Sequence, residues 1–246
     1  MNSWEAGVDA RGRVVWQAEV GAGESAVVLE AGMNCGAASW QRVIPLLAPH
    51  VRVVAYDRAG IGGSDPAPGL ATIDRQLDDL ASVVTGLRAG PCVLAGHSWG
   101  GVLVQMLALR RPDLVAGLVL VDPGHEEMES GLPLALRWGW RIMRAIHPDE
   151  LHGDVTVTDA ALRELRAAPS PFPHVPVVVL SAARSFPLPS RFRAHWTHLQ
   201  AGLAVAAPQG RHLVVDGTGH NIPRHRPDVV AGTILEVAAQ ARVSDG

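Results

Sequence analysis

The feature that most constrains this chain is a serine between two glycines, placed between an apolar strand-like run and a helix-like one. The motif Gly96-His-Ser-Trp-Gly100 follows the run Cys92–Ala95 and precedes a segment of helical pattern that reaches about Arg110. A serine on so sharp a turn is held in a strained backbone conformation, and the flanking glycines lack the Cβ atoms that would collide there. The pattern predicts a nucleophilic Ser98 used in acyl transfer, and a glycine turn with a bystander serine is the structural alternative.

The rest of the chain alternates buried strands with helices, which predicts an α/β fold. Apolar runs that fit strands covered on both faces occur at residues 26–30, 51–56, 92–95, 115–121, 177–181 and 211–215, and an edge hairpin is expected at 8–20. Helices are expected from Ser39 to about Ala48, after Thr72, from about Pro189 to Val205 and from Pro227 to Ala241. Parallel pairing would bring the carboxyl ends of the strands to one rim, where we expect the chemistry.

Residues 123–176 interrupt this alternation and are rich in proline and large apolar side chains. We expect them to form an inserted cap, with a short helix capped by Asp159, over an α/β core made of residues 1–122 and 177–246. Trp138 and Trp140 of the cap are candidates for lining a substrate pocket, although they could equally form the cap's own core.

Charge and cysteine content exclude several classes of protein. The formal net charge is −3, and all 21 cationic residues are arginine, which argues against broad binding of nucleic acid or anionic lipid and excludes lysine-based Schiff-base and P-loop chemistry. Cys35 and Cys92 form neither a metal-ligand pattern nor a disulfide framework. Because no signal-like or membrane-length apolar segment is present, we expect a cytoplasmic monomer or homodimer that acts on a small-molecule substrate.

Among the 11 histidines, His220 is the best candidate for a general base. It lies in a glycine-containing loop after the last strand, where it could approach Ser98. His97 adjoins the serine but is expected to be a packing or hydrogen-bonding residue. His195 and His198 have helical spacing without a nearby third ligand, so we expect a solvated face and no metal site.

The acid that should orient the base is indicated partly by an absence. No Asp or Glu occurs between Glu164 and Asp216, so the loop after the strand at 177–181 cannot supply it. Asp122, at the end of the preceding strand, is the expected replacement. Glu126, Glu127 or the lack of any acid remain alternatives.

An acyl-transfer site also needs two donors for the oxyanion, and we expect the backbone amides of Met33 and Trp99 to supply them. The substrate-pocket candidates are Gly32, Asn34, His97, His125, Trp138, Trp140 and Ile222.

Taken together, these motifs resemble the α/β-hydrolase superfamily, in particular serine-nucleophile, esterase- and lipase-like members whose acid follows the sixth strand. The similarity rests on the motif at 96–100, the run Tyr56-Asp-Arg-Ala-Gly-Ile-Gly-Gly-Ser64, Gly32 followed by Trp40, and Gly219-His220. It implies a mostly parallel eight-stranded sheet, a triad in the order Ser, acid, His, no cofactor, and a cap over the site. The chain departs from the family in having Ala31-Gly32 where a histidine-glycine pair is usual, and in its acid position.

The leading hypothesis is hydrolysis of a carboxylic ester, lactone or thioester of a small hydrophobic substrate through an acyl-serine. Epoxide or haloalkane hydrolysis on this fold would use a carboxylate at the elbow, and Ser98 argues against both. The alternatives are a non-hydrolytic or carbon–carbon-cleaving enzyme of secondary metabolism, and a ligand-binding protein with a weak triad.

Overall fold

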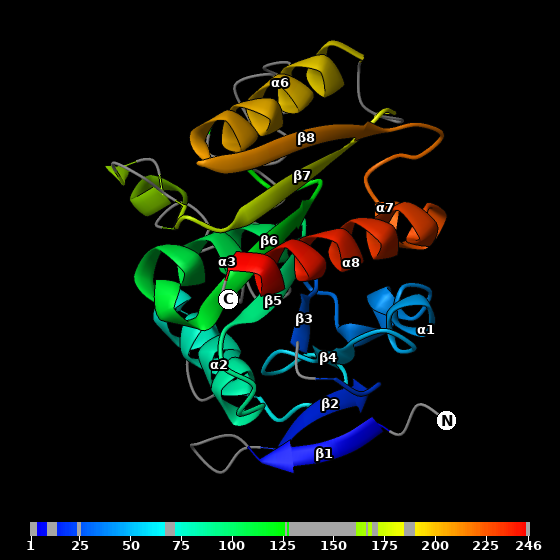
Figure 1. Ribbon diagram of the computed structural model, residues 1–246, viewed down its shortest axis with the longest axis vertical. Coiled ribbons are helices and arrows are strands. Elements are labelled where there is room, and N and C mark those ends of the chain that lie inside the picture. Colours follow the sequence, from blue (N-terminus) through cyan, green and yellow to red (C-terminus); the bar gives the residue numbers. More distant parts are fainter. Residues whose placement is uncertain are drawn as a thin grey trace, which may run out of the picture.

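The described part of the chain builds one sheet of eight strands with helices on both faces (Figure 1). A computed structural model describes residues 4–8, 14–23, 26–66, 72–125, 127, 161–165, 167–168, 172–184 and 190–244. The strands are β1 (Trp4–Val8), β2 (Val14–Val20), β3 (Ala26–Glu30), β4 (Arg52–Tyr56), β5 (Cys92–His97), β6 (Val115–Val121), β7 (Pro176–Ala182) and β8 (Gln209–Val215). Their order is β1-β2-β4-β3-β5-β6-β7-β8. Pairs β1–β2 and β2–β4 are antiparallel and the others parallel, which confirms the predicted fold class.

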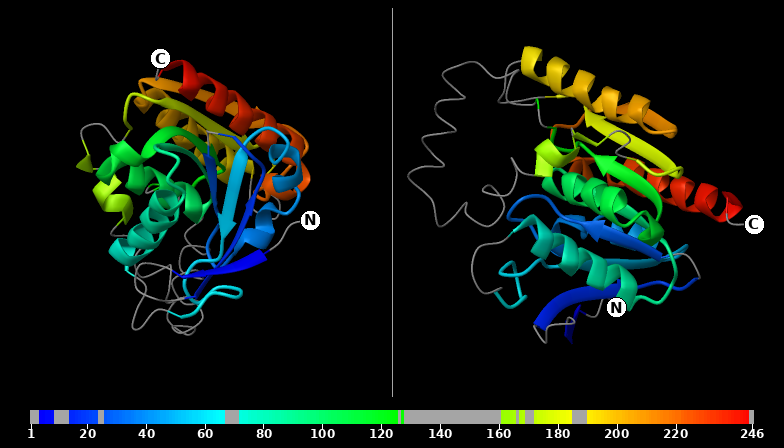
Figure 2. Two further views of the ribbon diagram at one scale, coloured as in Figure 1. Left: turned by 60° about the horizontal axis from the view of Figure 1, so that its bottom comes forward. Right: turned by 90° about the vertical axis from the view of Figure 1, so that its left-hand side faces the viewer.

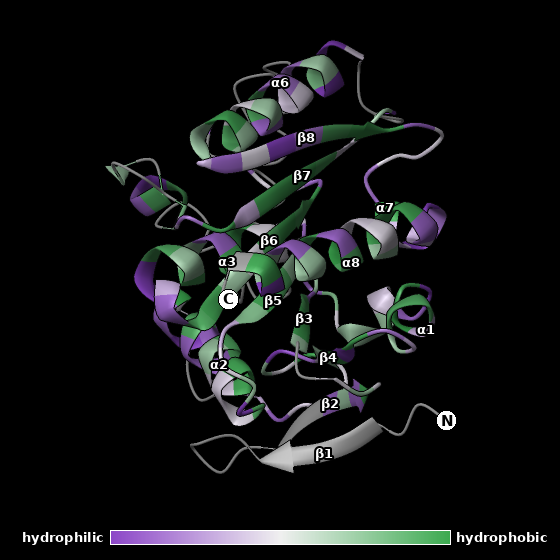
Figure 3. Ribbon diagram, in the orientation of Figure 1, coloured by the Kyte–Doolittle hydropathy of each residue, from purple (hydrophilic) through white to green (hydrophobic). Residues whose placement is uncertain are grey.

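Helices cover the sheet in two layers, which Figure 2 shows from two further sides. One layer holds α2 (Ile73–Gly86), α3 (Trp99–Arg110) and α6 (Ser190–Ala206), and the other holds α1 (Ile44–Leu47), α7 (Ile222–His225) and α8 (Pro227–Ser244). Alternate residues of β3 enter the two cores, with Val28 in the first and Val27 in the second. In Figure 3 the inner strand β7 is hydrophobic along most of its length, whereas the edge strand β8 begins hydrophilic. Within the described residues, no helix combines the length and apolar character needed to cross a lipid bilayer.

The helix expected from Ser39 to Ala48 does not form as one element. The structure has a 3-10 turn at Ala37–Trp40, in which the Ser39 hydroxyl donates to the Gly36 carbonyl at 2.7 Å, and then the single-turn helix α1. Pro45 has no N–H to bond the fourth residue before it, so a helix begun at Ser39 cannot continue through this position. By contrast, the predicted cap of α2 is confirmed, because Thr72 Oγ1 accepts from the Arg75 amide at 3.2 Å.

Ser98 forms the turn between β5 and α3 and has φ of 54° and ψ of −114°. A Cβ at Gly96 would lie 2.3 Å from the Gly100 carbonyl oxygen, and a Cβ at Gly100 would lie 2.3 Å from the Glu30 carbonyl oxygen. The two glycines therefore let the backbone pass close to itself and to the end of β3. This packing holds Ser98 in its left-handed conformation.

Most of the predicted cap lies outside the described residues, including Asp159, Trp138 and Trp140. Residues 161–165 are helical. The division into a core and a cap at 123–176 stays a prediction.

Substituting Gly96 by alanine should destabilise the protein by about 2–3 kcal/mol, because the new Cβ would meet a backbone oxygen that cannot swing aside. The matched control is Gly232→Ala in α8, which has no heavy atom within 4 Å of the added Cβ and should gain about 1 kcal/mol from helix propensity. Urea unfolding followed by circular dichroism measures both. Equal midpoints for Gly96→Ala and wild type would contradict the close packing at the turn.

Candidate active site

Three of the predicted residues lie on loops that follow the carboxyl ends of parallel strands. Ser98 follows β5 and is half-buried, and Asp122 follows β6 and is fully buried with φ of 43°. His220 follows β8, with 43% of its side chain exposed. Adjacent parallel strands end on the same side of the sheet, so three segments distant in sequence meet at one rim.

The structure brings His220 and Asp122 into direct contact. Nδ1 of His220 lies 2.7 Å from Oδ2 of Asp122. An ionised carboxylate only accepts hydrogen bonds, so Nδ1 is the donor and Nε2 faces away on the opposite side of the ring. The ring of His97, the residue before Ser98, lies 4.8 Å from that of His220 between centroids. The imidazole of His220 is thus placed beside the turn that holds Ser98.

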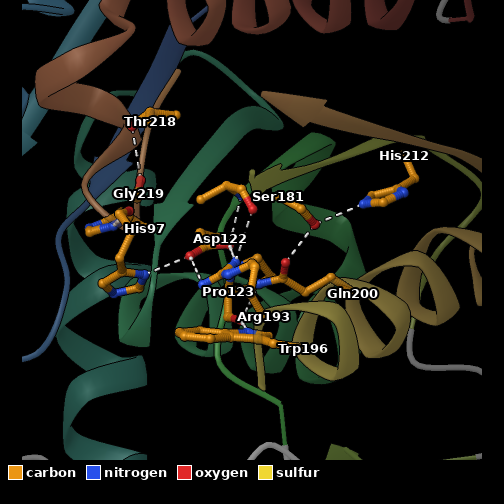
Figure 4. A network of polar contacts seen from close by, with 12 residues as sticks. His97, Asp122, Pro123, Ser181, Arg193, Trp196, Gln200, His212, Thr218 and Gly219 are labelled. Carbon is orange, nitrogen blue, oxygen red and sulfur yellow. Dashed lines mark hydrogen bonds and ion pairs between the residues drawn. The ribbon is translucent and has the colours of Figure 1, made fainter. Parts of the chain in front are cut away.

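Asp122 accepts hydrogen bonds at both carboxylate oxygens (Figure 4). Oδ1 accepts from the Ala182 amide at 3.1 Å and from Arg193 Nη1 at 2.7 Å. Oδ2 accepts from Arg193 Nη2 at 3.1 Å and from His220. Burial alone would raise the pKa of Asp122, but the hydrogen bonds from His220 and Arg193 outweigh it and lower the pKa to about 2. The carboxylate is therefore ionised at neutral pH.

Helix α6 supplies polar residues to this region that sequence reasoning missed. Arg193 lies between Asp122 and the Trp196 ring, with its guanidinium carbon 4.4 Å from the ring centroid (Figure 4). Trp196 Nε1 and Gln200 Nε2 both donate to the Pro123 carbonyl at 2.9 Å. Residues 193, 196 and 200 share one face of the helix. The signal available in the sequence was an arginine and a glutamine at helical spacing from Trp196, a residue type that is usually buried.

A second buried arginine holds the loop after β3, where the predicted oxyanion donor Met33 lies. Arg58 donates to the carbonyls of Ala31 at 2.8 Å and Gly32 at 2.6 Å, and to Glu30 Oε1 at 2.5 Å. Tyr56 donates its hydroxyl to the other oxygen of Glu30. Burial, followed by the nearby Glu30 charge, raises the pKa of Tyr56 well above its usual value, so the phenol keeps this proton.

Met33 is half-buried against the apolar core, and Gly32 lies close to the nucleophile turn. A Cβ at Gly32 would come within 3.5 Å of Ser98 Cβ and 3.3 Å of His97 Nδ1. Trp99 begins α3 directly after the serine, and its indole donates to Gln76 at 3.0 Å. The loop after β3 and the start of α3 therefore flank Ser98.

His97 is almost fully buried and fixed by a backbone contact. Its Nε2 donates to the His220 carbonyl at 2.9 Å, because a carbonyl oxygen can only accept. Desolvation by burial, followed by the charge of His220, lowers the pKa of His97 to about 4. His97 is therefore neutral above mildly acidic pH and tethers the loop that carries His220.

The remaining predicted residues lie in varied surroundings. Asn34 is exposed with φ of 53°, and His125 Nδ1 accepts from the Glu127 amide at 3.1 Å. Ile222 is fully buried and its side chain belongs to the core beneath α8. Of the alternative acids, Glu127 is exposed and Glu126 lies outside the described residues.

The histidines expected on a solvated helix face also lie on α6. His195 Nε2 lies 3.2 Å from the Glu127 carbonyl, and His198 is exposed.

Comparison with known proteins agrees with this architecture. The Bacillus subtilis protein YqjL is 25% identical over 214 residues, which cover 86% of this chain and 82% of YqjL. Lipase LipV of Mycobacterium tuberculosis is 42% identical over 84 residues, which span 34% of this chain and 31% of the lipase. A solved thermophilic esterase from Thermogutta terrifontis has 23% identity over 98% of this chain and 99% of its own, with a TM-score of 0.69, a likeness of fold alone.

A family model also matches residues 25–156, which is more than half of the chain, and its description is alpha/beta hydrolase fold. The matched region contains β3 to β6, the nucleophile turn and Asp122. The chain belongs to the α/β hydrolase fold family.

Proposed function

We propose that this protein is a serine hydrolase that cleaves a carboxylic ester, lactone or thioester of a small hydrophobic substrate through an acyl-serine intermediate. The observation that carries this proposal is the hydrogen bond between His220 Nδ1 and the buried Asp122, formed beside a serine held at positive φ. An imidazole oriented by an ionised carboxylate next to a strained serine is the arrangement that serine acyl transfer requires. Family membership and the similarity to lipase LipV support the reaction class.

In the first half of the reaction, Ser98 Oγ attacks the carbonyl carbon while His220 Nε2 takes the hydroxyl proton. The carbonyl oxygen becomes an oxyanion, for which the amides of Met33 and Trp99 are the proposed donors. Asp122 stabilises the imidazolium without taking its proton. His220 then gives the proton to the leaving oxygen or sulfur as the bond to the carbonyl carbon breaks, which leaves an acyl-Ser98.

In the second half, His220 takes a proton from water as the water oxygen attacks the acyl carbon. Collapse of the second tetrahedral intermediate returns that proton to Ser98 Oγ and releases the carboxylic acid. His97 is a poor base, because desolvation by burial lowers its pKa to about 4. Its neutral ring also avoids placing a second positive charge 4.8 Å from the imidazolium.

A fluorophosphonate probe should label Ser98 covalently, because the probe reacts with activated serine hydroxyls. The chain has no lysine, so trypsin cuts only after arginine and the mass increase should fall on the peptide 89–110, whose one serine is Ser98. Ser98→Ala should abolish both labelling and hydrolysis of chromogenic esters of graded acyl length. Folded wild-type protein that neither takes up the probe nor turns over any ester would refute the proposed function.

Asp122→Asn should lower kcat by about ten-thousandfold, as expected when the acid that fixes the imidazole tautomer is lost. Glu127→Gln is the matched control, since Glu127 was an alternative acid in the sequence and is exposed. Steady-state ester hydrolysis measures both variants. A large loss in Glu127→Gln with little change in Asp122→Asn would transfer the role to the other carboxylate.

The buried His97 should make stability depend on pH. Its pKa is about 4 in the folded protein against 6.5 for a free histidine, so between these values only the unfolded chain binds the proton. The contribution of His97 to the free energy of unfolding is therefore at its full value above pH 6.5. It falls by about 3 kcal/mol as the pH drops to about 4. Urea unfolding at both ends of this range should show that His97→Gln, which keeps an N–H donor, lacks this part of the pH dependence. An identical pH dependence in wild type and variant would be inconsistent with a neutral buried His97.

A further inference from the structure

The acid of the proposed triad is bound by two cationic or titratable side chains rather than one. Oδ2 of Asp122 accepts from His220 at 2.7 Å and from Arg193 Nη2 at 3.1 Å, while Oδ1 accepts from Arg193 Nη1 at 2.7 Å. We propose that Arg193 is a positioning residue that holds Asp122 in orientation and shares its negative charge, so that arginine, aspartate and histidine act as one unit. This inference rests on the proposed serine-hydrolase function.

Arg193 is held so that its forked guanidinium faces the carboxylate. The residue is 5% exposed, and the guanidinium stacks on the ring of Trp196, three residues along the same helix. Nη1 also lies 3.4 Å from the Ala182 carbonyl at the end of β7. A planar fork bound to both oxygens of a carboxylate restricts its rotation more than a single donor can.

The same helix also fixes the residue that follows the acid. Trp196 and Gln200 both donate to the carbonyl of Pro123, so three side chains on one face of α6 bind Asp122 and its neighbour. The Trp196 ring lies 5.2 Å from the ring of His220 between centroids. Helix α6 therefore supports the acid and one side of the base.

Charge sharing has a consequence for the base. During attack on the substrate, His220 becomes an imidazolium, and the Asp122 charge that would stabilise it is already balanced by a guanidinium on the same oxygens. Among the described residues, the titratable or charged side chains that face Asp122 and His220 are Arg193 from α6 and His97 from β5. His97 is neutral between pH 5 and 9, because burial lowers its pKa to about 4. Together with His220, Arg193 lowers the pKa of Asp122 and so keeps this carboxylate ionised at mildly acidic pH.

Removing Arg193 should reverse this effect. The uncompensated carboxylate would either stabilise the imidazolium more strongly or take up a proton itself, and in both cases the pair binds a proton at higher pH. An ionic neighbour at this distance typically changes a pKa by about 1–3, so the acid limb of the activity profile should rise by about one pH unit or more. A variant without the Arg193 guanidinium should consequently lose much more of its reaction rate at Ser98 near pH 6 than near pH 9.

The test compares Arg193→Met, Arg193→Lys and the control Arg191→Met, whose arginine lies exposed on the same helix. The readout is the second-order rate of fluorophosphonate labelling at Ser98 from pH 5 to 9. Methionine keeps most of the stem that packs on Trp196 and removes the charge, whereas lysine restores the charge without the fork. We expect at least a tenfold loss near pH 6 and a raised acid limb for methionine, a nearly unmoved limb with a several-fold lower rate for lysine, and no change for the control.

NMR titration of the carboxylate gives a second readout that does not need activity. The carboxyl carbon resonance of Asp122, assigned by its disappearance in Asp122→Asn, should titrate at a higher pH in Arg193→Met than in wild type, because hydrogen bonds from His220 and Arg193 lower the pKa of this carboxylate. If wild type is not labelled, the proposed function fails and this titration still decides the role of Arg193. Variants that lower the urea midpoint but leave both the acid limb and the Asp122 titration unmoved would show Arg193 to be merely structural and overturn the inference.

Discussion

This site depends on the hydrogen bonds that satisfy the buried carboxylate of Asp122. Taking an ionised carboxylate out of water is costly unless its oxygens are bonded, and here a strand amide, a guanidinium and an imidazole supply the donors. Those donors come from β7, α6 and the loop after β8. Satisfying one charge therefore fixes the relative positions of three elements that are far apart in the sequence.

Two buried arginines bind the segments that follow β3 and β6, the two neighbours of the strand that carries the nucleophile turn. Arg58, paired with Glu30, holds the carbonyls of the loop after β3, and Arg193, paired with Asp122, holds the acid. Each guanidinium binds several oxygens in defined directions, which a lysine ammonium does less well. Both arginines thus order backbone or carboxylate groups that the proposed chemistry needs.

Backbone strain is concentrated at the same place. Ser98 and Asp122 both have positive φ without being glycine, and each follows a parallel strand of the sheet. Such conformations persist only where the surroundings impose them, and close glycine packing at the turn and the hydrogen bonds around the carboxylate do so here. The tether from His97 to the His220 carbonyl adds a link between the turn and the last loop.

The sequence by itself determined most of the strands, the turn at Ser98 and the cap of α2, because apolar runs, paired glycines and an N-cap threonine act over a few residues. Strand β1 is an exception, because it lies at Trp4–Val8, before most of the hairpin predicted at 8–20. It also indicated Asp122, with Glu126 and Glu127 as alternatives, because no carboxylate lies between Glu164 and Asp216. It failed at Ser39, where Pro45 prevents one continuous helix. Only the tertiary structure decided that Arg193 meets Asp122, since the two are 71 residues apart. Nothing local to α6 specifies that contact, which arises from the order of β6, β7 and β8 in the sheet and the packing of α6 on β7 and β8.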